Sequence, residues 1–264
     1  MQRRKRNNFE RLSRFALLIS AALFVAGTSG CGSALRYKLP GGKTLVYGMS
    51  SVVSWDEDGK EVRAKATKKN MEITADVLDC IAGKCLINLK ARLSDGASDP
   101  VKGSSLGELE IRIDRSGRII QGSGMGLPLE TRLLFPVLPN TRLKNNQKWS
   151  EPFDRKMTQA KKKIRLEHEF LGKTMRGGRQ CYHIRGTASF VYSRVLGIKE
   201  KNLIGTATTN YKYSEDFYLS LDGYPLDMIV KEESRRVFVD NYTGETVITI
   251  EDALNTELAL LRIE

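Results

Sequence analysis

The sequence predicts a mainly β protein, built from antiparallel meander sheets that form a curved sheet, a sandwich or a half-barrel. Residues 108–114 alternate strictly between polar and apolar side chains, which is typical of a half-buried strand. Similar alternation recurs along the chain, for example at residues 217–221. Turn-forming pairs such as Asp222-Gly223 separate these runs, and no helical stripe of useful length follows residue 31.

A β-hairpin is expected between residues 71 and 93. Residues 71–77 and 87–93 both alternate, and the short loop between them contains a glycine. Cys80 and Cys85 stand at the two strand ends, where they would face each other within disulfide reach. A redox pair usually has two intervening residues rather than four, and no second ligand pair is present for zinc, so a disulfide is favoured.

The later part of the chain resembles the earlier part, which predicts two related β halves at residues 43–140 and 141–264. Residues 111–120 are similar to residues 218–226, each with an Asp and a Gly at the turn. The alternative is that two antiparallel meanders look alike without any duplication.

Cys181 has no obvious partner in this scheme. If the repeat is real, Cys181 is the counterpart of Cys85 and has lost its partner. Otherwise it is a thiol on a strand, or it forms an intermolecular disulfide.

The first 30 residues have the layout of a secretory signal peptide. Six basic residues and one acid, Glu10, precede an uncharged stretch of apolar and small side chains at residues 15–26. That stretch is too short to cross about 30 Å of hydrocarbon as a helix, which needs roughly 20 residues.

The tetrapeptide Thr28-Ser29-Gly30-Cys31 resembles the lipobox of bacterial lipoproteins. The resemblance implies that residues 1–30 are removed, that Cys31 carries the lipid, and that residues 31–42 link it to the β body. Thr28 departs from the family pattern, which prefers an aliphatic residue there. Gly32 stands where an Asp would resemble an inner-membrane retention signal, so the resemblance implies an outer-membrane lipoprotein facing the periplasm. An ordinary secretory signal and an uncleaved anchor are the alternatives.

A second, shorter resemblance lies in the middle of the chain. Residues 135–139 (Phe-Pro-Val-Leu-Pro), followed by Trp149, look like a segment of uncharacterised bacterial envelope lipoproteins. Those proteins commonly have a glycine-acid-x-Trp tetrapeptide here, from which Asn146-Gln147-Lys148-Trp149 departs. The resemblance implies no particular activity.

The charge distribution bears on the possible partners. The whole chain has a formal net charge of +12, of which the first 30 residues contribute +5, leaving +7. An exported protein does not meet the chromosome, so nucleic acid is not an expected partner. Lys161, Lys162 and Lys163 form the densest basic run, which could contact an anionic membrane or glycan surface. The alternative is a solvated strand edge, where lysines discourage edge-to-edge pairing.

No catalytic signature is present, so neither an enzymatic activity nor a cofactor or metal is expected. The chain lacks a GxSxG elbow, an HExxH motif, a glycine-rich phosphate loop and paired CxxC motifs. His168 lies on the opposite strand face from Glu167 and Glu169, which favours a core or edge histidine over a ligand. His183 follows Cys181 by two residues, a spacing rarely suited to proton transfer.

Two functions remain for the β body. The first is a non-enzymatic binding module for a hydrophobic ligand or lipid, because curved sheets of this size often leave a concave apolar face. The alternative is a structural or assembly component of the outer envelope that acts through protein–protein contacts.

Overall fold

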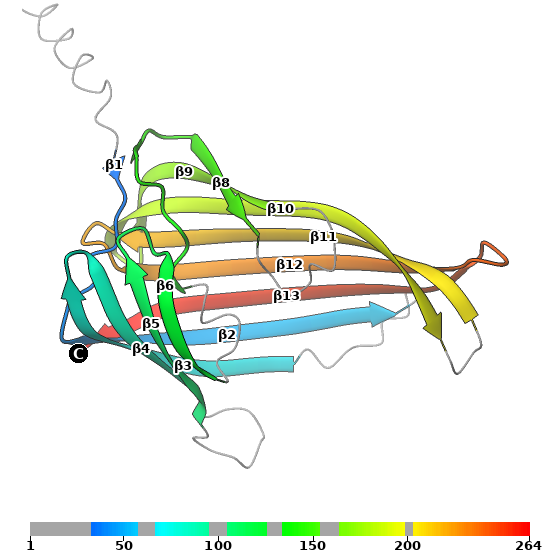
Figure 1. The fold of residues 1–264 in the computed structure, drawn as a ribbon, viewed down its shortest axis with the longest axis horizontal. Helices are drawn as coiled ribbons and strands as arrows, with labels where there is room; N and C mark the ends of the chain where they lie inside the picture. The colour runs from blue at the N-terminus through cyan, green and yellow to red at the C-terminus, as the bar shows by residue number, and fades with distance from the viewer. Residues whose placement is uncertain (1–32, 58–66, 95–104, 126–133, 154–163, 199–202) are drawn as a thin grey trace, which may run out of the picture.

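A computed structural model describes residues 33–57, 67–94, 105–125, 134–153, 164–198 and 203–264 of the chain. Eleven of its strands form one antiparallel sheet, which is strongly curved (Figure 1). They are β2 (Lys43–Glu57), β3 (Thr67–Ile81), β4 (Lys84–Leu93), β5 (Ser105–Asp114), β6 (Ile119–Met125), β8 (Gln147–Pro152), β9 (Arg165–Arg176), β10 (Arg179–Ile198), β11 (Leu203–Ser220), β12 (Pro225–Asp240) and β13 (Thr246–Ile263). Two short strands, β1 (Ser33–Ala34) and β7 (Arg142–Leu143), pair with each other.

The sheet is a meander in which neighbouring strands are successive in the chain, with one exception. The strand order is β6-β5-β4-β3-β2-β13-β12-β11-β10-β9-β8, so the first long strand pairs with the last. β6 and β8 form the two edges, and the sheet does not close into a barrel. The predicted mainly β meander is confirmed. The described strands form one continuous sheet across the β2–β13 pair, and they give no evidence of two related halves.

The β3–β4 hairpin shows how alternation produces two different faces. Ile73 and Ala75 are fully buried, whereas the side chains between the buried positions of β3 are half-buried. β4 places Ala91 and Leu89 directly opposite them. The predicted hairpin is therefore present, and its buried apolar side chains point to the inner face, which is defined here as the face that carries the core. At its tip Cys80 is opposite Cys85, and the two sulfurs are bonded, with 4.1 Å between the Cα atoms.

Two segments outside the sheet cover one end of the inner face, which we call the capped end (left in Figure 1). Leu35, Tyr37 and Leu39 belong to the first segment, and residues 134–138 form the second; both join the main core cluster. The Tyr37 hydroxyl donates to the Pro136 carbonyl at 2.9 Å, and the Tyr37 ring packs edge-on against Phe135.

Two glycines allow the first covering segment to lie close to the strand turns. Gly117 and Gly223 both have positive φ, and a Cβ on either would lie within 2.8 Å of neighbouring atoms. The Tyr37 amide bonds to the Arg115 carbonyl and the Lys38 amide to the Gly223 carbonyl. Within the described residues, no helix is long and apolar enough to cross a membrane.

The burial pattern of β3 predicts different effects on stability for the same substitution at two positions of this strand. Ile73→Ala should lower the free energy of unfolding by about 2–5 kcal/mol, because it leaves a cavity in the packed core. Ile81→Ala, in the same strand but 68 % exposed, should change it by less than about 0.5 kcal/mol. Chemical denaturation of both variants is the measurement, and equal losses would contradict the placement of the core on this face.

Candidate functional site

The inner face changes character along the strands. Strand register places the apolar residues Met49, Leu258, Met228, Phe217, Ile184 and Phe170 in one cross-strand row, and on edge strand β8 this row ends at Gln147. The next row toward the far end contains Ser51, Thr256, Val230, Glu215, Gly186, His168 and Trp149. This second row begins a stretch of buried polar side chains that we call the polar band.

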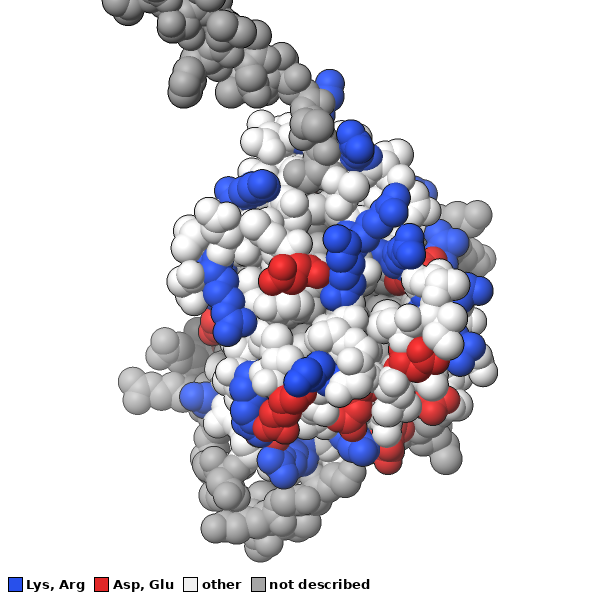
Figure 2. All heavy atoms as spheres, turned by 90° about the vertical axis from the view of Figure 1, so that its left-hand side faces the viewer, with Lys and Arg blue, Asp and Glu red and all other residues white. Residues whose placement is uncertain are grey.

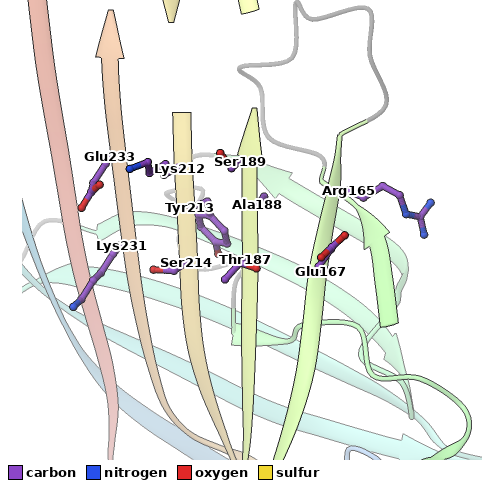
Figure 3. Close-up of a pocket in the computed structure, with 10 residues that line it drawn as sticks. All are labelled: Arg165, Glu167, Thr187, Ala188, Ser189, Lys212, Tyr213, Ser214, Lys231 and Glu233. Carbon is purple, nitrogen blue, oxygen red and sulfur yellow. The ribbon is translucent and has the colours of Figure 1, made fainter. Parts of the chain in front are cut away.

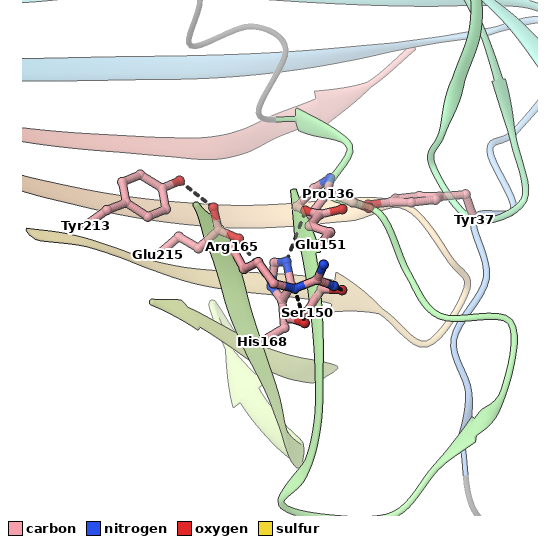
Figure 4. Close-up of polar contacts among 8 residues, drawn as sticks. All are labelled: Tyr37, Pro136, Ser150, Glu151, Arg165, His168, Tyr213 and Glu215. Atoms are coloured by element: carbon pink, nitrogen blue, oxygen red, sulfur yellow. Dashed lines mark hydrogen bonds and ion pairs between the residues drawn. The ribbon is translucent and has the colours of Figure 1, made fainter. Parts of the chain in front are cut away.

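His168 belongs to the polar band, on β9 next to edge strand β8, and is 1 % exposed. Its Nε2 atom is 3.0 Å from the Glu151 carboxylate, and its Nδ1 atom is 3.5 Å from that of Glu215 (Figure 4). The ring stacks on Trp149, with 5.0 Å between the ring centroids. Both ring nitrogens therefore face carboxylates.

Gly186 makes this arrangement possible. It lies on β10, between Glu215 on β11 and His168 on β9, so their side chains meet over a strand position that has no side chain. A Cβ at Gly186 would lie 2.7 Å from Cγ and Oε1 of Glu215. The missing side chain is thus a packing requirement of the polar band.

The other polar side chains of the band also hydrogen-bond across or along the strands. The Tyr213 hydroxyl donates to Glu215, and the Tyr211 hydroxyl donates to Glu232. The Ser51 and Thr256 hydroxyls are 2.9 Å apart. Such pairing is what allows polar groups to stay in a protein interior, where an unpaired group is costly.

The band also influences the tyrosine of the covering segment. The pKa of Tyr37 is raised well above its ordinary value, first by burial and then by Glu215, Tyr47 and Glu151. Tyr37 therefore stays neutral and keeps its hydroxyl proton for the Pro136 carbonyl.

Beyond the band, the inner face is partly open. Val53 and Trp55 point to this face because their partners across the strand, Leu254 and Asp252, continue the inner rows. Val53 is 41 % exposed and Trp55 is 53 % exposed. We call these two residues with the half-buried Leu254 the apolar extension; it is an exposed continuation of a face that is buried nearer the capped end.

The unclosed edge leaves a cleft of about 640 Å³ beside the band. One wall is edge strand β8, with Trp149 and Glu151, and the other is Ser116, Arg118 and residues 137–140. The Glu151 side chain is 22 % exposed, whereas that of His168 is fully buried. Glu151 is therefore the member of the His168 group that borders solvent.

The outer face carries a shallow polar groove of about 620 Å³ across β9 to β12 (Figure 3). Charged side chains of both signs line it: Arg165, Glu167, Lys212, Lys231 and Glu233. Oppositely charged side chains on neighbouring strands are typical of a sheet face that is in contact with solvent. In the described part of the chain, no group of three or more His, Cys, Asp or Glu side chains is placed to hold a metal ion.

The site residues predicted from sequence fall into two groups. Cys31 and the Lys161, Lys162 and Lys163 run lie outside the described residues. Cys80 and Cys85 form the bonded pair at the β3–β4 tip, remote from the polar band.

Cys181 and His183 do not form a pair. Cys181 is fully buried, its sulfur is 3.7 Å from the Thr174 carbonyl, and burial followed by the charge of Asp227 raises its thiol pKa. His183 instead contacts Asp216, with 2.7 Å between Nε2 and the carboxylate.

Sequence reasoning correctly placed His168 away from Glu167 and Glu169, but it missed Glu151 and Glu215. These partners come from strands β8 and β11, far from residue 168 in the chain. One signal was available: Glu215 occupies an inward position in the alternation Tyr211, Tyr213, Glu215, Phe217, where an acid is out of place.

Comparison with known proteins yields a distant structural resemblance and no family. No protein-family model matches the chain, and no curated protein sequence matches it. Among solved structures, the chain resembles one described as "Lipid-protein interactions in lipovitellin", with 14 % identity and a TM-score of 0.41. The match covers 86 % of this chain and 26 % of the other, so the chain spans about a quarter of that protein's length.

The role of Gly186 can be tested against a glycine in the same strand. Gly186→Ala should lower the free energy of unfolding by about 1–3 kcal/mol, because the new methyl group displaces Glu215 from Tyr213 and His168. Gly197→Ala has open space around its Cβ and should cost less than about 0.5 kcal/mol. The free energies of unfolding of both variants are measured by denaturant titration. A Gly186→Ala variant as stable as Gly197→Ala would refute the packing argument.

Proposed function

We propose that the chain is a lipid-anchored protein of the bacterial outer envelope whose sheet binds a hydrophobic ligand, such as an acyl chain, without catalysing a reaction. The observation that carries the proposal is the apolar extension. Val53 and Trp55 are exposed on the same face that is packed with apolar side chains a few residues away. Exposed apolar surface that continues a core face is characteristic of a binding site.

The openness of the sheet supports the same proposal. The covering segments close one end of the inner face, and edge strands β6 and β8 do not pair with each other. An acyl chain laid along the apolar extension would gain contact with Val53, Trp55 and Leu254, and its burial would remove the apolar surface of both partners from water.

A non-enzymatic role is supported by the engagement of the candidate catalytic groups. His168 and His183 each face carboxylates, and the Cys181 thiol is turned toward a backbone carbonyl. None of these side chains is positioned as a nucleophile with an adjacent base.

A structural or assembly role is the second candidate, and a different surface favours it. On the outer face of the β10–β11 hairpin, Val191, Val195 and Ile204 are 59 %, 66 % and 47 % exposed. These side chains would suit contact with another protein.

Ligand binding is testable by native mass spectrometry of the full chain extracted in mild detergent. We expect a co-purified lipid, and Trp55→Lys should reduce the lipid-bound fraction because it places a charge on the apolar extension. Val191→Lys, on the outer face, is the matched control and should leave that fraction unchanged. Absence of any bound lipid, together with loss of a crosslinked partner in the Val191→Lys variant, would favour the assembly role instead.

The anchor is tested separately. Cys31→Ala should abolish incorporation of a labelled fatty acid, because Cys31 is the proposed acceptor, whereas Cys181→Ala should not affect it. Unchanged labelling of the Cys31→Ala protein would rule out the lipobox interpretation.

A further inference from the structure

The capped end of the sheet is strongly basic. It consists of the first covering segment and the turns between strands, at residues 36–43, 82–84, 115–118, 142–146, 177–179 and 221–224. Within these ranges the only acidic residue is Asp222. Two further acids lie beside them: the half-buried Asp114, which accepts hydrogen bonds from Ser116 and Arg118, and the exposed Glu264, whose backbone bonds to Thr44. The basic residues are nine, and all are exposed: Arg36, Lys38, Lys43, Lys84, Arg115, Arg118, Arg142, Lys144 and Arg179.

The contacts among the turns show that these residues share one surface. Arg115 bonds to the covering segment through its backbone, and its side chain passes close to Gly83 in the neighbouring turn. Lys38 bonds to the β11–β12 turn, and Arg142 is paired with Ala34 of β1. Figure 2 views this end directly; in the upper half of the view most of the charged side chains are Lys or Arg, whereas in the lower half Asp and Glu are mixed with them.

The other end of the sheet differs in charge. The described turn between β12 and β13, residues 240–245, contains Asp240 and Glu245 and no basic residue. Among the turns that the structure describes, positive charge is therefore concentrated at the capped end, where the described chain begins.

Cys31 lies close in sequence to the capped end, which indicates which end of the molecule would face the membrane. The described chain begins at Ser33, in the strand that pairs with Arg142, only two residues after Cys31. Two residues span at most about 7 Å, less than the Debye length of about 8 Å at physiological ionic strength. A lipid on Cys31 would thus hold the capped end within the electrostatic field of the headgroups.

We propose that the capped end is a docking surface for an anionic phospholipid membrane, with the strands directed away from the bilayer. The inference rests on the proposed function in one respect, the lipid on Cys31. The basic surface does not depend on that proposal. In this orientation the capped end faces the headgroups, and the apolar extension, toward the other end of β2, faces the compartment (Figure 1). Phosphate groups and basic side chains attract each other, and this attraction weakens as salt is added.

The test uses the full chain with vesicles of phosphatidylcholine alone or with added phosphatidylglycerol. A fluorophore is attached either at Gly41→Cys, in the first covering segment, where no atom would crowd a Cβ, or at Tyr242→Cys, in the far turn. The parent chain controls for labelling of its own cysteines. With nitroxide-headgroup lipid in the vesicles, we expect quenching at residue 41 only, stronger with phosphatidylglycerol and weaker in high salt.

Charge-reversal variants distinguish an effect of the basic residues at the capped end from an effect of the overall net charge. Lys38→Glu, Arg142→Glu and Lys144→Glu together should lower binding to the anionic vesicles by at least about tenfold. The control combines Lys68→Glu, Lys69→Glu and Arg194→Glu, which changes the net charge equally at exposed positions away from the capped end and should have a much smaller effect.

The outcomes distinguish this inference from the proposed function. Equal quenching at residues 41 and 242, equal losses in the two triple variants, or no dependence on phosphatidylglycerol would overturn the docking surface even if Cys31 is acylated. A chain that lacks acylation but binds anionic vesicles through its capped end would overturn the anchor and leave the docking surface intact. Binding to an anionic glycan in place of these vesicles would also overturn it.

Discussion

The pairing of β2 with β13 is the contact on which the rest of the structure depends. It joins the first long strand to the last, from Leu45 opposite Ile263 to Glu57 opposite Ile250. The backbones of Thr44 and Glu264 extend it by bonding in both directions. Without this pair the molecule would be two smaller sheets with four exposed edges. Its register also matters, because a shift of one residue would turn every inward side chain outward.

A sheet that does not close into a barrel needs other ways to keep its inner face from water. In this chain the inner face is treated differently in three regions. At the capped end, Tyr37 and the residues around Pro136 cover the face and complete the core. In the middle, acids, tyrosines and His168 pair with one another, with Gly186 leaving the space for them. Toward the far end, Val53 and Trp55 remain exposed. From the capped end to the far end, the inner face therefore changes from a packed apolar core, through paired polar side chains, to exposed apolar side chains on the same strands.

This gradient gives the proposed function a physical basis. In the packed and paired regions most inward side chains are buried, whereas the apolar extension keeps exposed apolar surface that a ligand can cover. The same strands carry the charge asymmetry between the basic capped end and the far turn. The proposed ligand binding and the proposed membrane orientation thus involve different regions of one sheet, so that a mutation can be directed at one of them without changing the residues of the other.

Much of the fold could be predicted because it depends on local patterns. Alternation identified β strands, the hairpin around Cys80 and Cys85 followed from two neighbouring runs, and the inward position of His168 followed from its own strand. The partners of His168 could not be predicted, because Glu151 and Glu215 reach it only through the β8–β9 and β10–β11 pairings and the empty position at Gly186.

By itself, the sequence determined the β class, the meander of successive hairpins and the signal-like N-terminus, since each is encoded in neighbouring residues. Only the tertiary structure decided that β2 meets β13, that two separate segments cover one end, and that nine basic side chains share a surface. Those features depend on contacts between residues far apart in the chain. Side-chain periodicity specifies which face a residue occupies, but it does not specify which strand lies beside it.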